Sequence, residues 1–219
     1  MTTPIVTRFI YVRHGESTST VARTIGGPRT CGGLSPLGVQ QAERLRDRWK
    51  DTPEFVPDVV VASHFPRARE TAQIVAEAFG SPEVVVDDGF GEHDPGVDCD
   101  GMTMDDFVDR FGIGAWEDDP FGVTFPGGET LAEFQFRVGR TVRRFQDERP
   151  GETILVFCHG GVIDAVLRQA LKTAPTGGFS INTLNTSVTE LILGRPNMWT
   201  LRRYGDSAHL AGLPAATDR

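Results

Sequence analysis

The stretch Phe9-Ile10-Tyr11-Val12-Arg13-His14-Gly15 places a continuous apolar run directly before an arginine, a histidine and a glycine. A second stretch, Leu155-Val156-Phe157-Cys158-His159-Gly160-Gly161, has a similar arrangement late in the chain. Short apolar runs rich in β-branched residues are typical of strands buried on both faces, as in parallel sheets. Ligands of open α/β sheets bind at the carboxyl ends of the strands. The two stretches therefore predict central strands whose histidines lie at the same edge of one sheet.

Strand and helix patterns alternate along the rest of the chain. Besides residues 9–12, strands are predicted over residues 59–62, 84–86, 154–157, 187–193 and 199–204, and helices over residues 39–49, 67–79, 131–145 and 162–171. Ser35, followed by Pro36, is a predicted N-cap for the first of these helices. This alternation predicts an α/β fold, a three-layer α/β/α sandwich with a mostly parallel central sheet.

Residues 94–126 interrupt the alternation with glycine, proline and aspartate. We interpret them as an insert that forms a flap over the sheet. Residues 92–119 hold ten acidic residues and one basic residue, a net charge of −9, whereas the remaining 21 basic and 20 acidic residues nearly balance. The prediction is one domain over residues 1–204 with this acidic insert, followed by a loose C-terminal tail over 205–219.

The composition excludes several classes of protein. Hydrophobic residues make up 39% and charged residues 24%, as in ordinary globular proteins. A net charge of −8 argues against a nucleic-acid partner. No run approaches the ~18 apolar residues of a membrane span, and the first residues do not resemble a signal peptide, so we expect a cytoplasmic protein without a membrane partner. The three scattered cysteines predict free thiols rather than disulfides or a zinc site.

A cation follows a third predicted strand end. Arg67 lies near the start of the helix after strand 59–62, where arginine and the helix N-terminus can both bind a phosphate group. The glycines after the two histidines, Gly15 and Gly160, let the backbone approach a ligand closely.

These motifs occur together in one order: Arg13-His14-Gly15-Glu16-Ser17, Arg67-Ala68-Arg69-Glu70-Thr71-Ala72, Glu92 and His159-Gly160-Gly161. From about Phe9 to Leu193 the sequence resembles the histidine phosphatase superfamily, the phosphoglycerate mutase-like group. The resemblance implies that His14 attacks phosphorus and carries the phosphoryl group. It also implies that Glu92 protonates the leaving oxygen, and that the phosphate oxygens are held by Arg13, Arg67 and His159.

Elementary chemistry agrees with these implied roles. A phosphomonoester carries a charge of about −1.5 to −2 near neutral pH, so several fixed cations are needed to hold it. A histidine nucleophile must be neutral, and adjacent arginines disfavour its imidazolium form. We find no His-Glu-x-x-His spacing or other ligand cluster, so no metal and no other cofactor is predicted.

For several other residues near these motifs, a structural role is as plausible as a role in substrate binding. Ser17 could donate to the phosphate or cap a helix, and Arg23 could reach an anionic substrate or stay at the surface. Structural roles are favoured for His64 and His93, and for Glu129, the alternative proton donor. The predicted substrate-binding residues are Gly15, Ser17, Thr20, Arg23 and Gly160.

The predicted function is hydrolysis of a small phosphomonoester, with a small phosphorylated metabolite as the partner. One alternative is a phosphoglycerate mutase, which would return the phosphoryl group from His14, but the acidic insert should disfavour polyanions. Another is a non-catalytic interaction domain on the same fold, which has no need of a nucleophile and an acid together. The strand 187–193 could also be an exposed edge that pairs in a homodimer.

Overall fold

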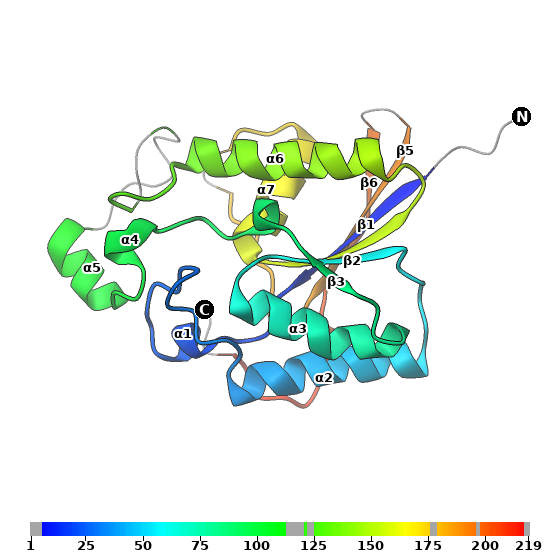
Figure 1. Cartoon of the computed structure of the whole chain (residues 1–219), viewed down its shortest axis with the longest axis horizontal. Helices are drawn as coiled ribbons and strands as arrows, with labels where there is room; N and C mark the ends of the chain where they lie inside the picture. Colours follow the sequence, from blue (N-terminus) through cyan, green and yellow to red (C-terminus); the bar gives the residue numbers. More distant parts are fainter. Residues whose placement is uncertain (1–5, 113–120, 122–124, 176–178, 196–197, 217–219) are drawn as a thin grey trace, which may run out of the picture.

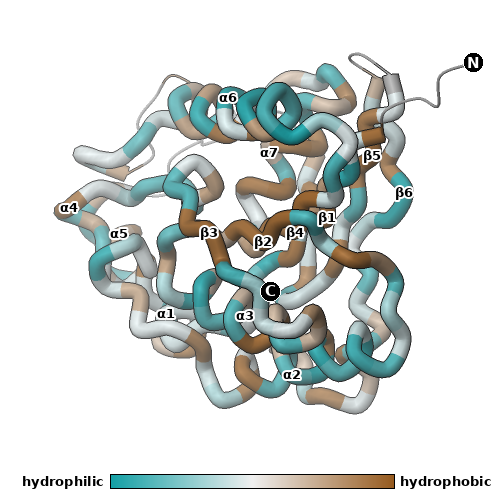
Figure 2. Tube along the Cα trace, turned by 45° about the vertical axis from the view of Figure 1, so that its right-hand side comes forward, coloured by the Kyte–Doolittle hydropathy of each residue, from teal (hydrophilic) through white to brown (hydrophobic). Residues whose placement is uncertain are grey.

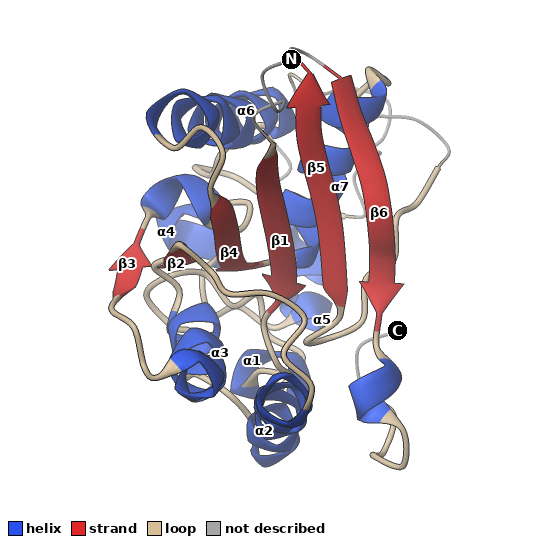
Figure 3. Cartoon of the chain, turned by 90° about the vertical axis from the view of Figure 1, so that its right-hand side faces the viewer, coloured by secondary structure: helices blue, strands red, loops and turns tan. Residues whose placement is uncertain are grey.

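A computed structural model describes residues 6–112, 121, 125–175, 179–195 and 198–216. Six strands form one sheet in the order β3-β2-β4-β1-β5-β6 (Figure 3). The strands are β1 (Thr7–Arg13), β2 (Val59–Ala62), β3 (Val84–Val86), β4 (Thr153–Cys158), β5 (Val188–Arg195) and β6 (Met198–Asp206). Each predicted strand is present, with ends displaced by a few residues.

The sheet is mixed. Strands β1, β4, β2 and β3 pair in parallel, whereas β5 runs antiparallel to both β1 and β6. The predicted α/β fold is confirmed. The prediction that strand 187–193 is an exposed edge is wrong, because β5 lies between β1 and β6 and the edge strand is β6. The next strand along the chain can pair with a strand in a β-hairpin and so cover its edge. The periodicity of one segment does not reveal such pairing.

Two pairs of helices cover the sheet. Helices α2 (Pro36–Asp51) and α3 (Pro66–Ala76) lie on one face, and α6 (Leu131–Glu148) and α7 (Gly160–Leu171) lie on the other (Figure 1). Shorter elements in the described residues are α1 (Thr18–Val21), α4 (Gly96–Cys99), α5 (Met104–Phe111), and the 3-10 helices η1 (Glu77–Phe79), η2 (Asp88–Phe90) and η3 (Ala208–Leu210).

Alternation along β1 divides the core between the two faces. Phe9 and Tyr11 belong to the cluster with α6 and α7, whereas Ile10 and Val12 belong to the cluster with α2 and α3. Figure 2 shows the hydrophobic residues concentrated in β1, β2 and β4, between helices with hydrophilic outer surfaces. A sheet buried on both faces requires such continuous apolar strands, which is why the sequence identifies them.

Local capping fixes where two long helices begin. The Oγ of Ser35 accepts a hydrogen bond from the Gly38 backbone N–H over 3.0 Å, as predicted. Helix α6 begins with a capping box between Thr130 and Glu133. None of the helices in the described part of the chain has the length and apolar character that a membrane crossing requires.

The predicted acidic insert contains α4 and α5, which extend beyond the end of the sheet (Figure 1). A small core of Ile25, Cys99, Phe107 and Phe125 packs this region against the loop after α1. Asp100 ties the two segments together, since its carboxylate accepts from the backbone N–H groups of Gly27 and Arg29. Residues 113–120 and 122–124 of the insert lie outside the described residues.

The start of the predicted C-terminal tail differs from the prediction. Strand β6 continues to Asp206, and η3 contacts α2. Asp206 pairs with Arg48 over 2.7 Å, and Nε2 of His209 lies 2.9 Å from the Oγ1 of Thr186. These contacts join residues far apart in sequence, so the polar, small-residue composition of the segment gave no sign of them.

Candidate active site

The two strand-end histidines meet at the carboxyl edge of the sheet. Parallel pairing of β1 with β4 aligns Arg13 with Cys158, so the histidines that follow lie side by side. The ring centroids of His14 and His159 are 5.0 Å apart at an interplanar angle of 62°. Both side chains are buried. The sequence prediction that they share one edge is confirmed.

Hydrogen bonds define the tautomer of His14. Its Nδ1 lies 2.7 Å from the carbonyl oxygen of Gly15, which can only accept, so Nδ1 carries the proton. The Nε of Arg67 donates to Nε2 of His14 over 3.0 Å, so Nε2 carries the lone pair. Burial, then Arg67 and Arg13, lower the pKa of His14 well below its usual value. The ring is therefore neutral, with the lone pair of Nε2 directed at the Arg67 guanidinium.

The backbone around His14 is held from two sides. Gly15 donates its N–H to Thr71 Oγ1 over 3.0 Å, and Asn185 Nδ2 donates to the His14 carbonyl over 3.0 Å. A Cβ on Gly15 would lie 2.5 Å from the backbone oxygen of Gly38, so only glycine fits against the start of α2. Gly15 thus has a packing role, and its N–H is committed to Thr71.

Arg67 is buried and held in a fixed orientation. Its NH1 donates to the carbonyl of Gly26 over 2.8 Å and contacts Cys31 Sγ at 3.4 Å. Its guanidinium also lies over the Phe65 ring, 4.6 Å from the centroid. These contacts preorganise the cation beside His14, which is the arrangement that stabilises charge on a transferring phosphoryl group.

Arg13 and His159 complete this side of the site. Burial, then Arg67, lower the pKa of His159 well below its usual value, so its ring is neutral. Arg13 NH1 donates to the carbonyl of Thr183 over 2.5 Å. A Cβ on Gly160 would lie 3.6 Å from Arg13 Nε, which places Gly160 beside this guanidinium. His159 Nε2 lies 2.8 Å from Ser63 Oγ. Its buried Nδ1 has no hydrogen-bond partner among the described residues and is free to bind an oxygen of a ligand.

Glu92 lies in the loop between η2 and α4, and its side chain reaches the first turn of α7. Its Oε2 accepts from the Gly161 N–H over 3.2 Å, and its Oε1 accepts from the His93 N–H over 3.0 Å. A Cβ on Gly161 would lie 2.3 Å from Oε1, so this glycine makes room for the carboxylate.

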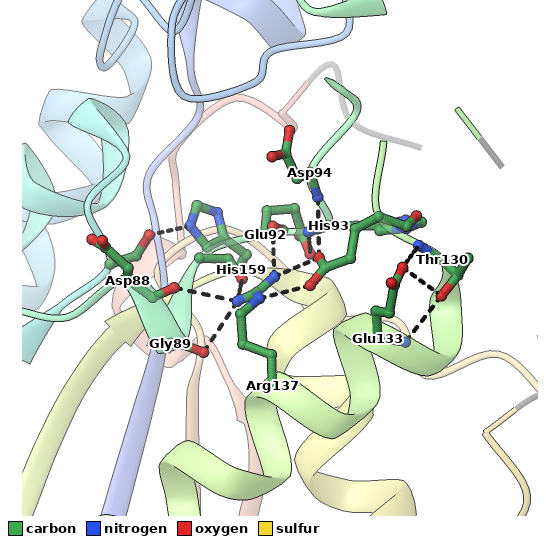
Figure 4. Close-up of polar contacts among 12 residues, drawn as sticks. Asp88, Gly89, Glu92, His93, Asp94, Thr130, Glu133, Arg137 and His159 are labelled. Carbon is green, nitrogen blue, oxygen red and sulfur yellow. Dashed lines mark hydrogen bonds and ion pairs between the residues drawn. The ribbon is translucent and has the colours of Figure 1, made fainter. Parts of the chain in front are cut away.

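Arg137 holds the loop of Glu92 in place. From α6 its guanidinium donates to the carbonyls of Gly91 and Glu92 over 3.0 and 3.1 Å, and it also reaches Gly89 (Figure 4). It forms a bidentate pair with Glu129 over 2.7 and 2.8 Å. Glu129 is therefore engaged structurally, in line with the interpretation favoured from its Gly-Gly-Glu setting.

The remaining candidates occupy the surroundings. Ser17 caps α1 by accepting from the Thr20 N–H, and the two hydroxyl oxygens are 2.9 Å apart. Arg23 has an exposed side chain that lies 3.7 Å from Asp105, so the structure does not bring it to the histidines. His64 lies 3.4 Å from a carboxylate oxygen of Asp88.

Sequence reasoning missed several residues of the site. Ser63 directly follows β2, so the strand-end rule that identified the histidines could have found it. Asn185 lies in a segment, residues 185–189, that resembles part of the histidine phosphatase superfamily. Thr183, Cys31 and Arg137 carried no comparable signal, because their contacts depend on how loops and α6 come together in the fold. Among the described residues, no group of three or more His, Cys, Asp or Glu side chains is arranged to hold a metal ion.

With this geometry, the chain belongs to the histidine phosphatase superfamily (branch 1), which matches residues 9–207. Phosphoglycerate mutase-like protein 4 of Arabidopsis thaliana is 32% identical over 204 residues, covering 92% of this chain and 86% of that protein. The metal-independent phosphoserine phosphatase of Arabidopsis thaliana is 26% identical over 211 residues, covering 95% and 85%. The solved structure of mycobacterial hydrolase 1 superposes with a TM-score of 0.76 at 26% identity, covering 93% of this chain and 100% of that one.

Proposed function

We propose that this protein is a metal-independent phosphatase that hydrolyses a small phosphomonoester through a phosphohistidine on His14. The observation that carries the proposal is the tautomer of His14. Its Nδ1 proton is held by Gly15, and its Nε2 lone pair lies 3.0 Å from the Arg67 guanidinium. A phosphate bound by that guanidinium would meet the nucleophilic nitrogen directly.

The first step forms the bond from Nε2 of His14 to phosphorus and breaks the bond from phosphorus to the leaving oxygen. Protonated Glu92 gives its proton to that oxygen, and an alcohol or phenol departs. Arg13, Arg67 and the unpartnered Nδ1 of His159 stabilise the charge on the phosphoryl oxygens.

The second step returns the enzyme to its starting state. Water attacks phosphorus, its proton passes to the Glu92 carboxylate, and the bond to His14 breaks with release of inorganic phosphate. The N–H groups of Gly161 and His93 orient the Glu92 carboxylate for both steps.

The phosphatase function is favoured over mutase activity by charge around the site. Asp88, Asp94, Glu129 and Glu133 line a cavity of about 560 Å³ that borders Glu92, with Arg137 already paired to Glu129. This acidic entrance disfavours a doubly phosphorylated intermediate.

A non-catalytic interaction domain has no need of the fixed His14 tautomer. The cysteines among the described residues are free thiols, which supports the proposed cytoplasmic location.

The test uses phenyl phosphate as the substrate in the presence of a chelator. Turnover by the wild-type protein and a loss of at least about 1,000-fold in His14→Ala would support the proposal. A requirement for added metal, or undiminished turnover in the variant, would overturn it. Rapid interconversion of 2- and 3-phosphoglycerate would indicate the mutase instead.

A further inference from the structure

A cavity of about 390 Å³ opens from the candidate active site on the side of Glu92. Arg67, Glu92 and Gly161 border one part of it. A phosphomonoester bound at Arg67 would therefore direct its leaving group into this cavity. The remaining lining residues define what kind of leaving group fits there.

Most of the lining is apolar. Ile25 and Pro95 come from the loop and insert segments, Phe125 from the end of the insert, and Leu131 and Phe134 from α6. Apart from Pro95, these residues belong to or pack against two hydrophobic clusters, so the core behind them fixes the position of the wall. Apolar walls of this kind gain stability by contact with an apolar ligand surface.

Part of this wall is aromatic. The His93 ring lies between two phenylalanines, with its centroid 5.6 Å from that of Phe125 and 5.5 Å from that of Phe134. His93 Nε2 lies 2.5 Å from the Glu129 carbonyl, which fixes the ring. Phe125 and Phe134 are 8% and 2% exposed, so the half-buried His93 ring is the most accessible of the three to a further planar group.

The polar part of the lining holds two acidic residues, Glu92 and Asp164, beside Arg67, His93 and Gln135. Asp164, four residues after Gly160 on α7, faces the same cavity as Glu92. Burial raises the pKa of Asp164, the bond from Arg168 opposes this, and Glu92 adds to it. Asp164 accepts from Arg168 Nε over 2.7 Å and is a carboxylate next to the space a leaving group would occupy. An anionic leaving group would meet the Asp164 carboxylate there.

Resting on the phosphatase function proposed above, we infer that the substrate is a monoester of a flat, largely apolar alcohol or phenol that carries no second anionic group. The aromatic wall of His93, Phe125 and Phe134 binds the ring, and Asp164 rejects a negative substituent. Asp164 is a specificity-determining residue, and a positively charged or hydrogen-bond-donating substituent is accepted beside it.

The first experiment isolates the ring. Benzyl phosphate and glycerol 3-phosphate both release a primary alcohol. They differ chiefly in whether the leaving group carries an aromatic ring that can contact the apolar wall of the cavity. We expect kcat/KM for benzyl phosphate to be higher by about 30-fold, the order expected for burying one ring. In Leu131→Ala the ratio should fall by about threefold or more. Equal kcat/KM values for the two substrates in the wild-type protein would overturn the inference.

The second experiment isolates the charge. The substrates are 4-(aminomethyl)phenyl phosphate and 4-carboxyphenyl phosphate, and the variant is Asp164→Asn, whose amide oxygen can still accept from Arg168. The wild-type protein should prefer the aminomethyl substrate by about tenfold or more, and the variant should lose most of this preference. Asp147→Asn is the matched control, because Asp147 forms the same i,i+4 pair with Arg143 on an exposed helix surface. A preference that Asp164→Asn leaves unchanged would contradict the inference.

The two proposals fail in different ways. Absence of turnover with all four substrates would contradict the phosphatase function itself. The other outcome is turnover that is lost in His14→Ala but is the same for ring and non-ring substrates and for both substituent charges. It would support the phosphatase function and overturn the inferred substrate class.

Discussion

Arg67 donates its Nε proton to Nε2 of His14 over 3.0 Å, so the proposed phosphate-binding cation and the proposed nucleophile are in direct contact. The bond has two consequences. It fixes the lone pair of His14 on the nitrogen that faces the phosphate site, and together with burial it keeps the pKa of His14 low. In the proposed mechanism, the Arg67 side chain thus both prepares the nucleophile and binds the phosphate that it attacks.

Arg67→Gln should therefore change the pH profile as well as the rate. We expect kcat/KM to fall by about 100-fold or more, since a fixed cation at the transferring group is lost. The pKa of His14 should rise toward its usual value of 6.5, which moves the acid limb of the profile to higher pH. Arg69→Gln, an exposed neighbour on α3, is the control. An acid limb that stays in place in Arg67→Gln would contradict this account of His14.

Replacement of Glu92 tests its role as the proton donor. Glu92→Gln keeps one oxygen, which can accept from either Gly161 or His93, and removes the transferable proton. We expect kcat/KM, which reports the first step alone, to fall by about 100-fold for an alkyl phosphate and far less for 4-nitrophenyl phosphate, whose leaving group needs no protonation. Equal losses for both substrates would show that Glu92 acts in another way.

A pair of adjacent glycines tests whether the position of Glu92 matters. A Cβ on Gly161 would lie 2.3 Å from Glu92 Oε1, whereas the nearest atom to a Cβ on Gly160 is Thr183 Oγ1 at 3.4 Å. Gly161→Ala should displace the carboxylate and lower kcat by about tenfold, a typical cost of misplacing a catalytic group. Gly160→Ala should have a clearly smaller effect. Equal kcat values for Gly161→Ala and Gly160→Ala would contradict this prediction.

Much of this fold follows from sequence periodicity, and the limits of that reasoning are physical. Continuous apolar runs such as Ile154–Phe157 identify central strands because both sheet faces are buried. The strand-end rule then brings His14, His159 and Arg67 together. It cannot identify Arg137, whose role depends on backbone carbonyls of a loop brought to α6 by folding. The docking of η3 likewise depends on contacts with α2 and with the Thr186 turn that lie far away in sequence.

His209 provides a test of that docking. Burial lowers its pKa from 6.5 to about 4, so the folded protein binds its proton less readily than the unfolded chain. The free energy of unfolding should be unaffected above pH 6.5 and should decrease as pH falls from 6.5 toward 4, by about 3 kcal/mol from this residue.

The variant for this test is His209→Gln, which can keep a bond to Thr186 without titrating. Urea unfolding at pH 7 and pH 4.5 measures the difference in free energy of unfolding. The decrease between the two pH values should be smaller in the variant than in the wild-type protein. An identical decrease would show that His209 is not buried in the folded protein.

The most direct test of the central claim is to trap the phosphoryl group on His14. The protein would be mixed with ³²P-labelled phenyl phosphate, quenched in alkali within milliseconds and digested for peptide mapping. We predict an acid-labile, alkali-stable label on the peptide that contains His14, formed at a rate no slower than kcat and absent from His14→Ala. Turnover without a labelled protein under any quench time, or a label on a peptide that lacks His14, would contradict the account.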